Sequence, residues 1–139
     1  MSTALKRSTY SVFGLLWASG CVWWIVHALF PQQTSFGNAP NPWEPTIIRL
    51  HGWLAAAGIF LLGWVSARHI VDRWSESLRR PSGPFLAILV AFLVVTGFAL
   101  YYTTDRLHEL AATTHEVLGG AGILLALIHW GRNGSRRRK

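Results

Sequence analysis

Residues 114–130 read THEVLGGAGILLALIHW, an almost uncharged apolar segment with a histidine near each end. The step from His115 to His129 is fourteen residues, close to four turns of an α-helix, so both imidazoles lie on one helix face. At about 1.5 Å of rise per residue they are roughly 21 Å apart, which places one near each surface of a hydrocarbon core of about 30 Å. An ionisable side chain inside a membrane helix indicates a functional site, because the bilayer has no water to solvate it.

The composition is that of a membrane protein. Of the 139 residues, 51% are hydrophobic and 14% are charged, and the mean hydropathy is +0.30. A soluble domain carries about 25% charged residues. The net charge of +7 does not indicate nucleic-acid binding, because the basic residues cluster beside apolar segments, where membrane topology places them. The single Cys21 excludes an internal disulfide and a Cys-x-x-Cys-His attachment motif.

Four apolar segments predict an all-α integral membrane protein, a single-domain four-helix bundle with up-down-up-down topology. We expect helices at about 11–30, 47–79, 84–102 and 113–131, and a basic tail at 132–139. Residues 31–45 are predicted to be a loop, and Pro45 can open the second helix. Residues 103–115 are predicted to form a connection with a short surface helix. Thr113 and Glu116 have capping-box spacing for the start of the fourth helix.

The basic residues predict the orientation of the chain. All of the 13 Lys and Arg residues except Arg49 and Arg106 flank the N-terminus, the second connection or the C-terminus. Because cytoplasmic segments carry the excess of Lys and Arg, we expect both termini on the cytoplasmic side.

A weak internal repeat relates the two halves of the chain. It pairs Ser19-Gly20 with Thr96-Gly97, and residues 50–64 with residues 114–128. His51 thereby corresponds to His115, and Gly58 to Gly122. A duplicated helix pair makes the second and fourth helices parallel, so that their histidines can meet across a bundle.

The histidines of these two helices fall on two levels. His51 and His69 are eighteen residues apart, which is five helical turns and again one face. His51 and His115 share the outer level, and His69 and His129 share the inner level. Paired imidazoles from facing helices are the axial ligands of a low-spin haem b. The pattern predicts two non-covalent haems b.

Other residues could complete such sites. Glycines between the levels leave room for a porphyrin, although close helix packing also uses glycine. The candidates are Gly58, Gly119 and Gly122. Haem propionates require cationic partners. Arg49 outside, with Arg68 and Arg132 inside, are candidates that are equally explained as boundary charges.

Three further polar residues near the outer surface have open roles. His27 lies near the level of His51 and could replace it as a ligand or relay protons. His108 is expected in solvent. Glu116 could orient His115 or carry a proton, but helix capping is the commoner role for a glutamate there.

Three short patterns resemble the flavinylation-associated cytochrome family of small bacterial membrane proteins. They are His115-x-x-x-Gly119 followed by His129, Thr96-Gly97 running into Leu100-Tyr101-Tyr102, and Arg49-Leu50-His51-Gly52 followed by His69 and Trp74. More distantly, they are similar to the four-helix di-haem core of cytochrome b in quinol-oxidising complexes. The eighteen-residue step in the second helix departs from the fourteen-residue pattern of those complexes.

The resemblance implies a multi-pass protein of the bacterial cytoplasmic membrane. Its matching ligand positions are His51 with His115, and His69 with His129. The implied redox partners are a quinone or a dehydrogenase inside and a flavoprotein outside. We therefore expect an electron-transfer protein. The resemblance leaves open whether it is also an oxidoreductase subunit that acts on a quinone.

Two alternatives remain at this point. The first is a membrane protein that binds or transports copper or zinc through histidines gathered at the outer mouth, namely His27, His51, His108 and His115. It leaves His69 and His129 unused. The second is a structural membrane subunit whose histidines make hydrogen bonds between helices.

Overall fold

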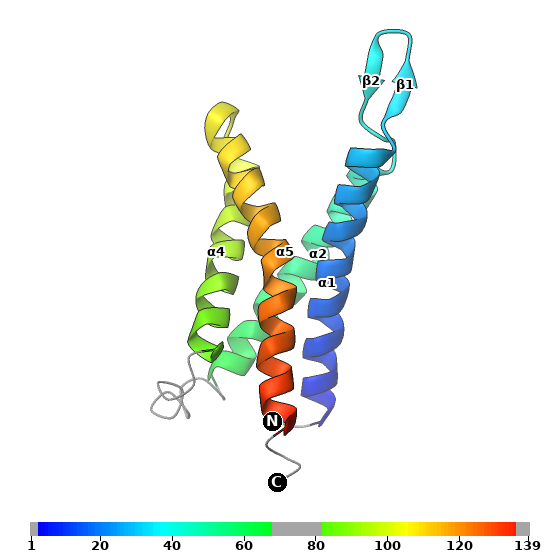
Figure 1. Ribbon diagram of the computed structural model, residues 1–139. Helices are drawn as coiled ribbons and strands as arrows, with labels where there is room; N and C mark the ends of the chain where they lie inside the picture. Colours follow the sequence, from blue (N-terminus) through cyan, green and yellow to red (C-terminus); the bar gives the residue numbers. More distant parts are fainter. Residues whose placement is uncertain (1–2, 68–81, 136–139) are drawn as a thin grey trace. The chain divides into compact units, whose positions relative to one another are not determined.

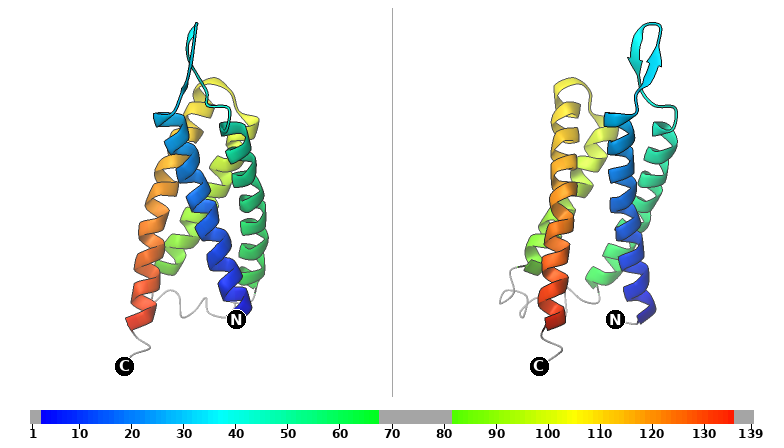
Figure 2. Two further views of the ribbon diagram at one scale, coloured as in Figure 1. Left: turned by 90° about the vertical axis from the view of Figure 1, so that its right-hand side faces the viewer. Right: turned by 45° about the vertical axis from the view of Figure 1, so that its right-hand side comes forward.

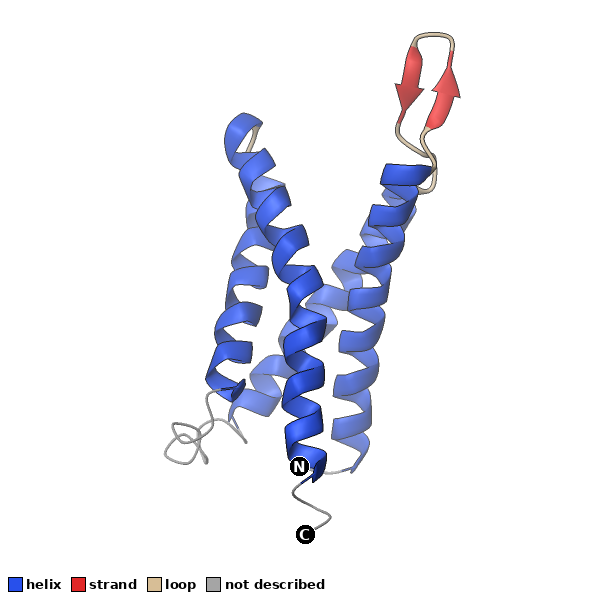
Figure 3. Cartoon of the chain, viewed as in Figure 1, coloured by secondary structure: helices blue, strands red, loops and turns tan. Residues whose placement is uncertain are grey.

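The computed structural model describes residues 3–67 and 82–135, with side chains at 3–67 and 85–127. The chain divides into two compact units, Met1–Asp72 and Arg73–Lys139. Each unit is built around two long helices that pack against each other (Figure 1). Apart from one small hairpin and short connections, the described residues are helical (Figure 3). The predicted helical class is therefore confirmed, with the hairpin as an addition.

The first unit contains α1 (Thr3–Leu29) and α2 (Glu44–Val65). The two helices run antiparallel and contact each other along their length (Figure 2). Both begin earlier than predicted, and Pro45 lies in the first turn of α2 as expected. The predicted extension of this helix to residue 79 lies largely outside the described residues.

A β-hairpin lies in the connection between α1 and α2, within residues 31–45, which the sequence predicts to be a loop. Strands β1 (Gln32–Thr34) and β2 (Gly37–Ala39) pair antiparallel. The Thr34 hydroxyl donates to the Gly37 carbonyl at 2.6 Å and accepts the Phe36 N–H at 3.3 Å. Gly37 has φ +109°, a conformation that a side chain would strain. The Gly and Asn content that indicated a loop suits this tight turn equally well.

The second unit contains α4 (Ser82–Tyr102) and α5 (Asp105–Ser135), which run antiparallel (Figures 1 and 2). Two residues, Thr103 and Thr104, connect them. Asp105 starts α5 with φ +52°, a left-handed conformation that Asp tolerates better than most residues. The Thr104 hydroxyl donates to its carboxylate at 3.0 Å.

The start predicted for the fourth helix is wrong, because α5 is continuous from Asp105. No separate surface helix precedes it within the described residues 82–135. Residues 105–118 contain strong helix formers and neither Gly nor Pro, so nothing interrupts the helix. Thr113 and Glu116 are interior positions of α5, where the backbone N–H groups that a capping box satisfies are already bonded.

Four helices of the described chain are long and apolar enough to cross a membrane, as the sequence predicts. Their candidate spans are Thr3–Leu29, Glu44–Val65, Phe85–Tyr102 and Asp105–Leu127. Among the described side chains, the buried apolar residues are Leu89 and Ala111, each 8% exposed. Large apolar side chains such as Leu15, Phe92 and Leu124 are exposed. Surfaces of this kind are expected where lipid covers the helices.

Candidate functional site

His51 of α2 lies against α1 at Ser19 and Gly20. The Ser19 hydroxyl oxygen and His51 Nδ1 are 3.0 Å apart, which is hydrogen-bond distance. A Cβ atom at Gly20 would lie 3.2 Å from His51 Cε1 and 3.5 Å from Nδ1, so this edge of the ring rests on the α1 backbone. Ser19 is a buried polar residue. The contacts that hold this imidazole in the first unit therefore include a hydrogen bond and a close approach to the α1 backbone.

His115 of α5 lies against α4 in the same way. The Thr96 hydroxyl oxygen and His115 Nδ1 are 2.9 Å apart. A Cβ atom at Gly97 would lie 3.4 Å from His115 Cε1 and 3.8 Å from Nδ1. The second unit thus holds its own imidazole with a hydroxyl and a glycine that are adjacent in the sequence.

The two units make this contact at positions that the sequence repeat pairs. The equivalent positions are Ser19 and Thr96, Gly20 and Gly97, and His51 and His115. In both units the hydroxyl bonds Nδ1, and the glycine one residue later meets Cε1. The two halves of the repeat therefore match in side-chain arrangement as well as in sequence.

The hydrogen bonds favour one tautomer of each imidazole. The Ser19 hydroxyl donates to the Leu16 carbonyl at 2.8 Å, and the Thr96 hydroxyl lies 2.8 Å from the Phe92 carbonyl and 3.2 Å from the Leu93 carbonyl. A hydroxyl has one proton, which these carbonyls of its own helix accept. Each hydroxyl oxygen is then an acceptor for the Nδ1–H of its histidine. A neutral imidazole with its proton on Nδ1 carries its lone pair on Nε2.

The three glycines predicted to face a cofactor have packing contacts within their own units. Gly58 lies against Leu16 and Phe13 of α1, at 3.6 Å and 3.8 Å from a Cβ placed on the glycine. The equivalent distance from Gly122 to Leu89 of α4 is 3.3 Å, and from Gly119 to Leu93 it is 4.0 Å. These contacts are close helix packing, the other role that the sequence allows for them. Their role beside a cofactor stays a prediction.

The described side chains do not include the predicted inner histidine pair. His69 and Arg68 lie outside the described residues, and the side chains of His129 and Arg132 lie outside the described part of α5. The inner site therefore stays a prediction. Of the polar residues predicted near the outer surface, Arg49, His108 and Glu116 are exposed.

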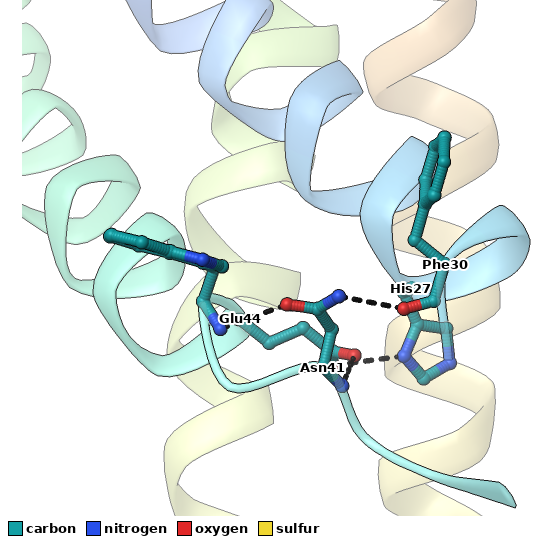
Figure 4. Close-up of polar contacts among 5 residues, drawn as sticks. His27, Phe30, Asn41 and Glu44 are labelled. Carbon is teal, nitrogen blue, oxygen red and sulfur yellow. Dashed lines mark hydrogen bonds and ion pairs between the residues drawn. The ribbon is translucent and has the colours of Figure 1, made fainter. Parts of the chain in front are cut away.

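His27 contacts a glutamate that the sequence did not single out. His27 Nδ1 and Glu44 Oε2 are 3.0 Å apart (Figure 4), and the His27 side chain is 55% exposed while that of Glu44 is 11% exposed. The His27 ring also stacks on Trp23, one turn earlier in α1, with centroids 5.0 Å apart. The pair links the last turn of α1 to the first residue of α2.

The same glutamate closes the turn before α2 (Figure 4), whose N-cap residue, Trp43, has no side-chain capping bond. The Asn41 side-chain oxygen accepts the Trp43 N–H at 3.0 Å, which makes an Asx turn, and Glu44 Oε1 accepts the Asn41 N–H at 2.7 Å. The Asn41 side-chain amide also donates to the Phe30 carbonyl at 2.7 Å. The sequence signal for this turn is Asn41 followed by Pro42, because Asn-Pro favours the start of a turn.

We expect Asn41→Ala to lower the free energy of unfolding by about 1–2 kcal/mol, because it removes the Asx-turn bond before α2 and a bond to the end of α1. Titration of the full chain in detergent micelles with a denaturing surfactant, followed by tryptophan fluorescence, measures this change. The matched control is Asn38→Ala, at an exposed position of β2. Equal stability of the two variants would contradict the role of Asn41 in this turn.

Among the described side chains, no group of three or more His, Cys, Asp or Glu residues could hold a metal ion. Comparisons of the chain with protein-family models, with curated proteins and with solved structures find no match.

Proposed function

We propose that the chain is a di-haem b-type cytochrome that passes electrons across the cytoplasmic membrane. The observation that carries this proposal is the matched pair of imidazoles, His51 and His115, each bonded through Nδ1 to a hydroxyl of the neighbouring helix. Histidines that bind metals almost always donate their other ring N–H to an acceptor, which fixes the tautomer and the ring orientation. Both histidines have this acceptor, and both lie on helices apolar enough to cross a membrane.

The donor set fits a haem with two histidine ligands. A neutral imidazole with its lone pair on Nε2 is the axial ligand that haem iron takes from a protein. The repeat pairs His51 of the first unit with His115 of the second, so we propose that these two histidines would hold one haem iron. When bound, haem supplies an iron centre that accepts and releases one electron. The chain supplies the two ligands and an apolar surrounding.

A second haem held by His69 and His129 completes the proposal. Its support is the spacing of eighteen and fourteen residues that puts each inner histidine on the face of its outer counterpart. Arg49 on the outer side, and Arg68 with Arg132 on the inner side, are the proposed propionate partners.

The proposal includes the location and the partners of the protein. The distribution of Lys and Arg supports a multi-pass protein with both termini cytoplasmic. We propose a quinone or a dehydrogenase as the inner redox partner and an extracytoplasmic flavoprotein as the outer one, which the resemblance to flavinylation-associated cytochromes suggests.

Absorption spectroscopy of the full chain, purified in detergent from haem-sufficient cells, tests the function. We expect the sharp bands of a reduced low-spin haem b and a haem-to-protein ratio of two. Colourless protein would contradict the proposal. Copper or zinc bound in place of haem would instead support a metal-binding or transport protein. A ratio of one would limit the proposal to a single site.

A further inference from the structure

We infer that Ser19 and Thr96 are positioning residues, each of which lowers the reduction potential of the iron that its own histidine, His51 or His115, would hold. This inference rests on the proposed function, and it concerns two hydroxyls that the ligand pattern alone does not identify. Neither hydroxyl would touch the iron. Each acts through the ring to which it is bonded, at 3.0 Å for Ser19 and 2.9 Å for Thr96.

Each hydroxyl is the middle member of a chain of two hydrogen bonds. The imidazole Nδ1–H donates to the hydroxyl, and the hydroxyl donates to a carbonyl of its own helix, Leu16 for Ser19 and Phe92 for Thr96. A hydroxyl that donates is a stronger acceptor, because successive hydrogen bonds polarise one another. The Nδ1–H bond is therefore more polarised than a single hydrogen bond would make it.

Polarisation at Nδ1 increases the electron density at Nε2, the nitrogen assigned to the iron. A more basic imidazole stabilises ferric iron more than ferrous iron, which lowers the reduction potential. The bonds from Ser19 and Thr96 to their own helix carbonyls also fix where each hydroxyl oxygen lies. The close contacts at Gly20 and Gly97 limit how near each ring lies to the neighbouring helix. Ring orientation and ligand basicity thus depend on the same two hydroxyls.

Two other threonines provide matched controls. Thr9 in α1 donates to the Leu5 carbonyl at 2.8 Å, and Thr103 at the end of α4 donates to the Ala99 carbonyl at 2.7 Å. Among the described side chains, neither of these hydroxyls is hydrogen-bonded to a histidine. Replacing them removes the same kind of bond to the helix carbonyl and leaves both imidazoles in place.

Potentiometric titration of the haem-loaded full chain tests the inference. Ser19→Ala and Thr96→Val should each raise the potential of one haem and weaken its binding by about 10–100-fold. A tenfold change in the ratio of ferric to ferrous affinity corresponds to about 59 mV. The conservative variants Ser19→Thr and Thr96→Ser should restore the wild-type potential. Thr9→Val and Thr103→Val should leave it unchanged.

Nitrogen NMR of histidine in the chain prepared without haem gives a second readout. The wild type should carry the proton of His51 and of His115 on Nδ1, and the Ser19→Ala and Thr96→Val variants should populate both tautomers. A proton on Nε2 in the wild type would overturn the inference. So would potentials in haem-loaded Ser19→Ala and Thr96→Val equal to those of the threonine controls, a result that leaves the proposed function intact. Colourless wild-type protein would instead remove the proposed function itself.

Discussion

His51→Ala and His115→Ala should each remove the same haem, and the double variant should lose no more haem than either single variant. If both imidazoles were to bind one iron, the loss of either ligand would weaken the binding that holds the cofactor. The haem-to-protein ratio should fall from two to one in all three variants. The reduced absorption spectrum should then be that of the remaining haem alone.

The matched control is His108→Ala, which lies in the same helix, α5, but is exposed to solvent. We expect this variant to keep both haems. If the two single variants remove spectroscopically different haems, and the double variant removes both, then His51 and His115 do not share an iron. Each unit would then hold its own haem ligand, and the proposed pairing of His51 with His115 would be overturned.

Gly20→Val should remove the same haem without touching a ligand. A Cβ atom at this position would lie 3.2 Å from His51 Cε1, tighter than nine in ten real Cβ contacts, and valine adds two further carbons. We expect the imidazole to shift away from α1, which strains its bond to Ser19 and displaces Nε2. Spectroscopy should show a ratio near one, and the unfolding free energy should fall.

Gly14→Val is the control for this substitution, because nothing lies within 4 Å of a Cβ placed at Gly14. The two variants share the cost of replacing glycine by valine in α1, so that their difference reports the contact with His51. Gly97→Ala should have a milder effect, since its Cβ distance to His115 Cε1 is 3.4 Å. Two intact haems in Gly20→Val would show that this edge of His51 is not constrained by the α1 backbone.

Much of the fold follows from sequence patterns that indicate whether a segment prefers water or an apolar environment. Apolar runs identify four membrane-length helices, and Pro45 correctly indicates where α2 begins. The alignment of Ser19 with Thr96 predicts that these residues occupy equivalent positions in the two units. The sequence does not show that each hydroxyl is bonded to the imidazole of the following helix. That contact depends on the packing of two helices, which local propensity does not encode.

One prediction failed because its pattern has two physical meanings. The spacing of Thr113 and Glu116 is that of a capping box, yet both residues lie inside α5. Side-chain bonds to free backbone N–H groups occur instead in the turn from Asn41 to Glu44, before α2 begins. The link between Glu44 and His27 was also unpredictable, because it joins the ends of two helices across an intervening hairpin.

The connections within the two units differ in how much change in chain length they permit. Ser19 and His51 are 32 residues apart, whereas Thr96 and His115 are 19 apart, although the contacts are alike. A residue inserted early in α5 turns the preceding part of the helix by about 100° relative to His115, and only Thr103 and Thr104 are available to compensate. In the first unit, β1 and β2 lie beyond the helix ends and can lengthen without changing the register of α1 against α2. Variation in this hairpin can therefore alter the surface at this end of the first unit while His51 stays in place.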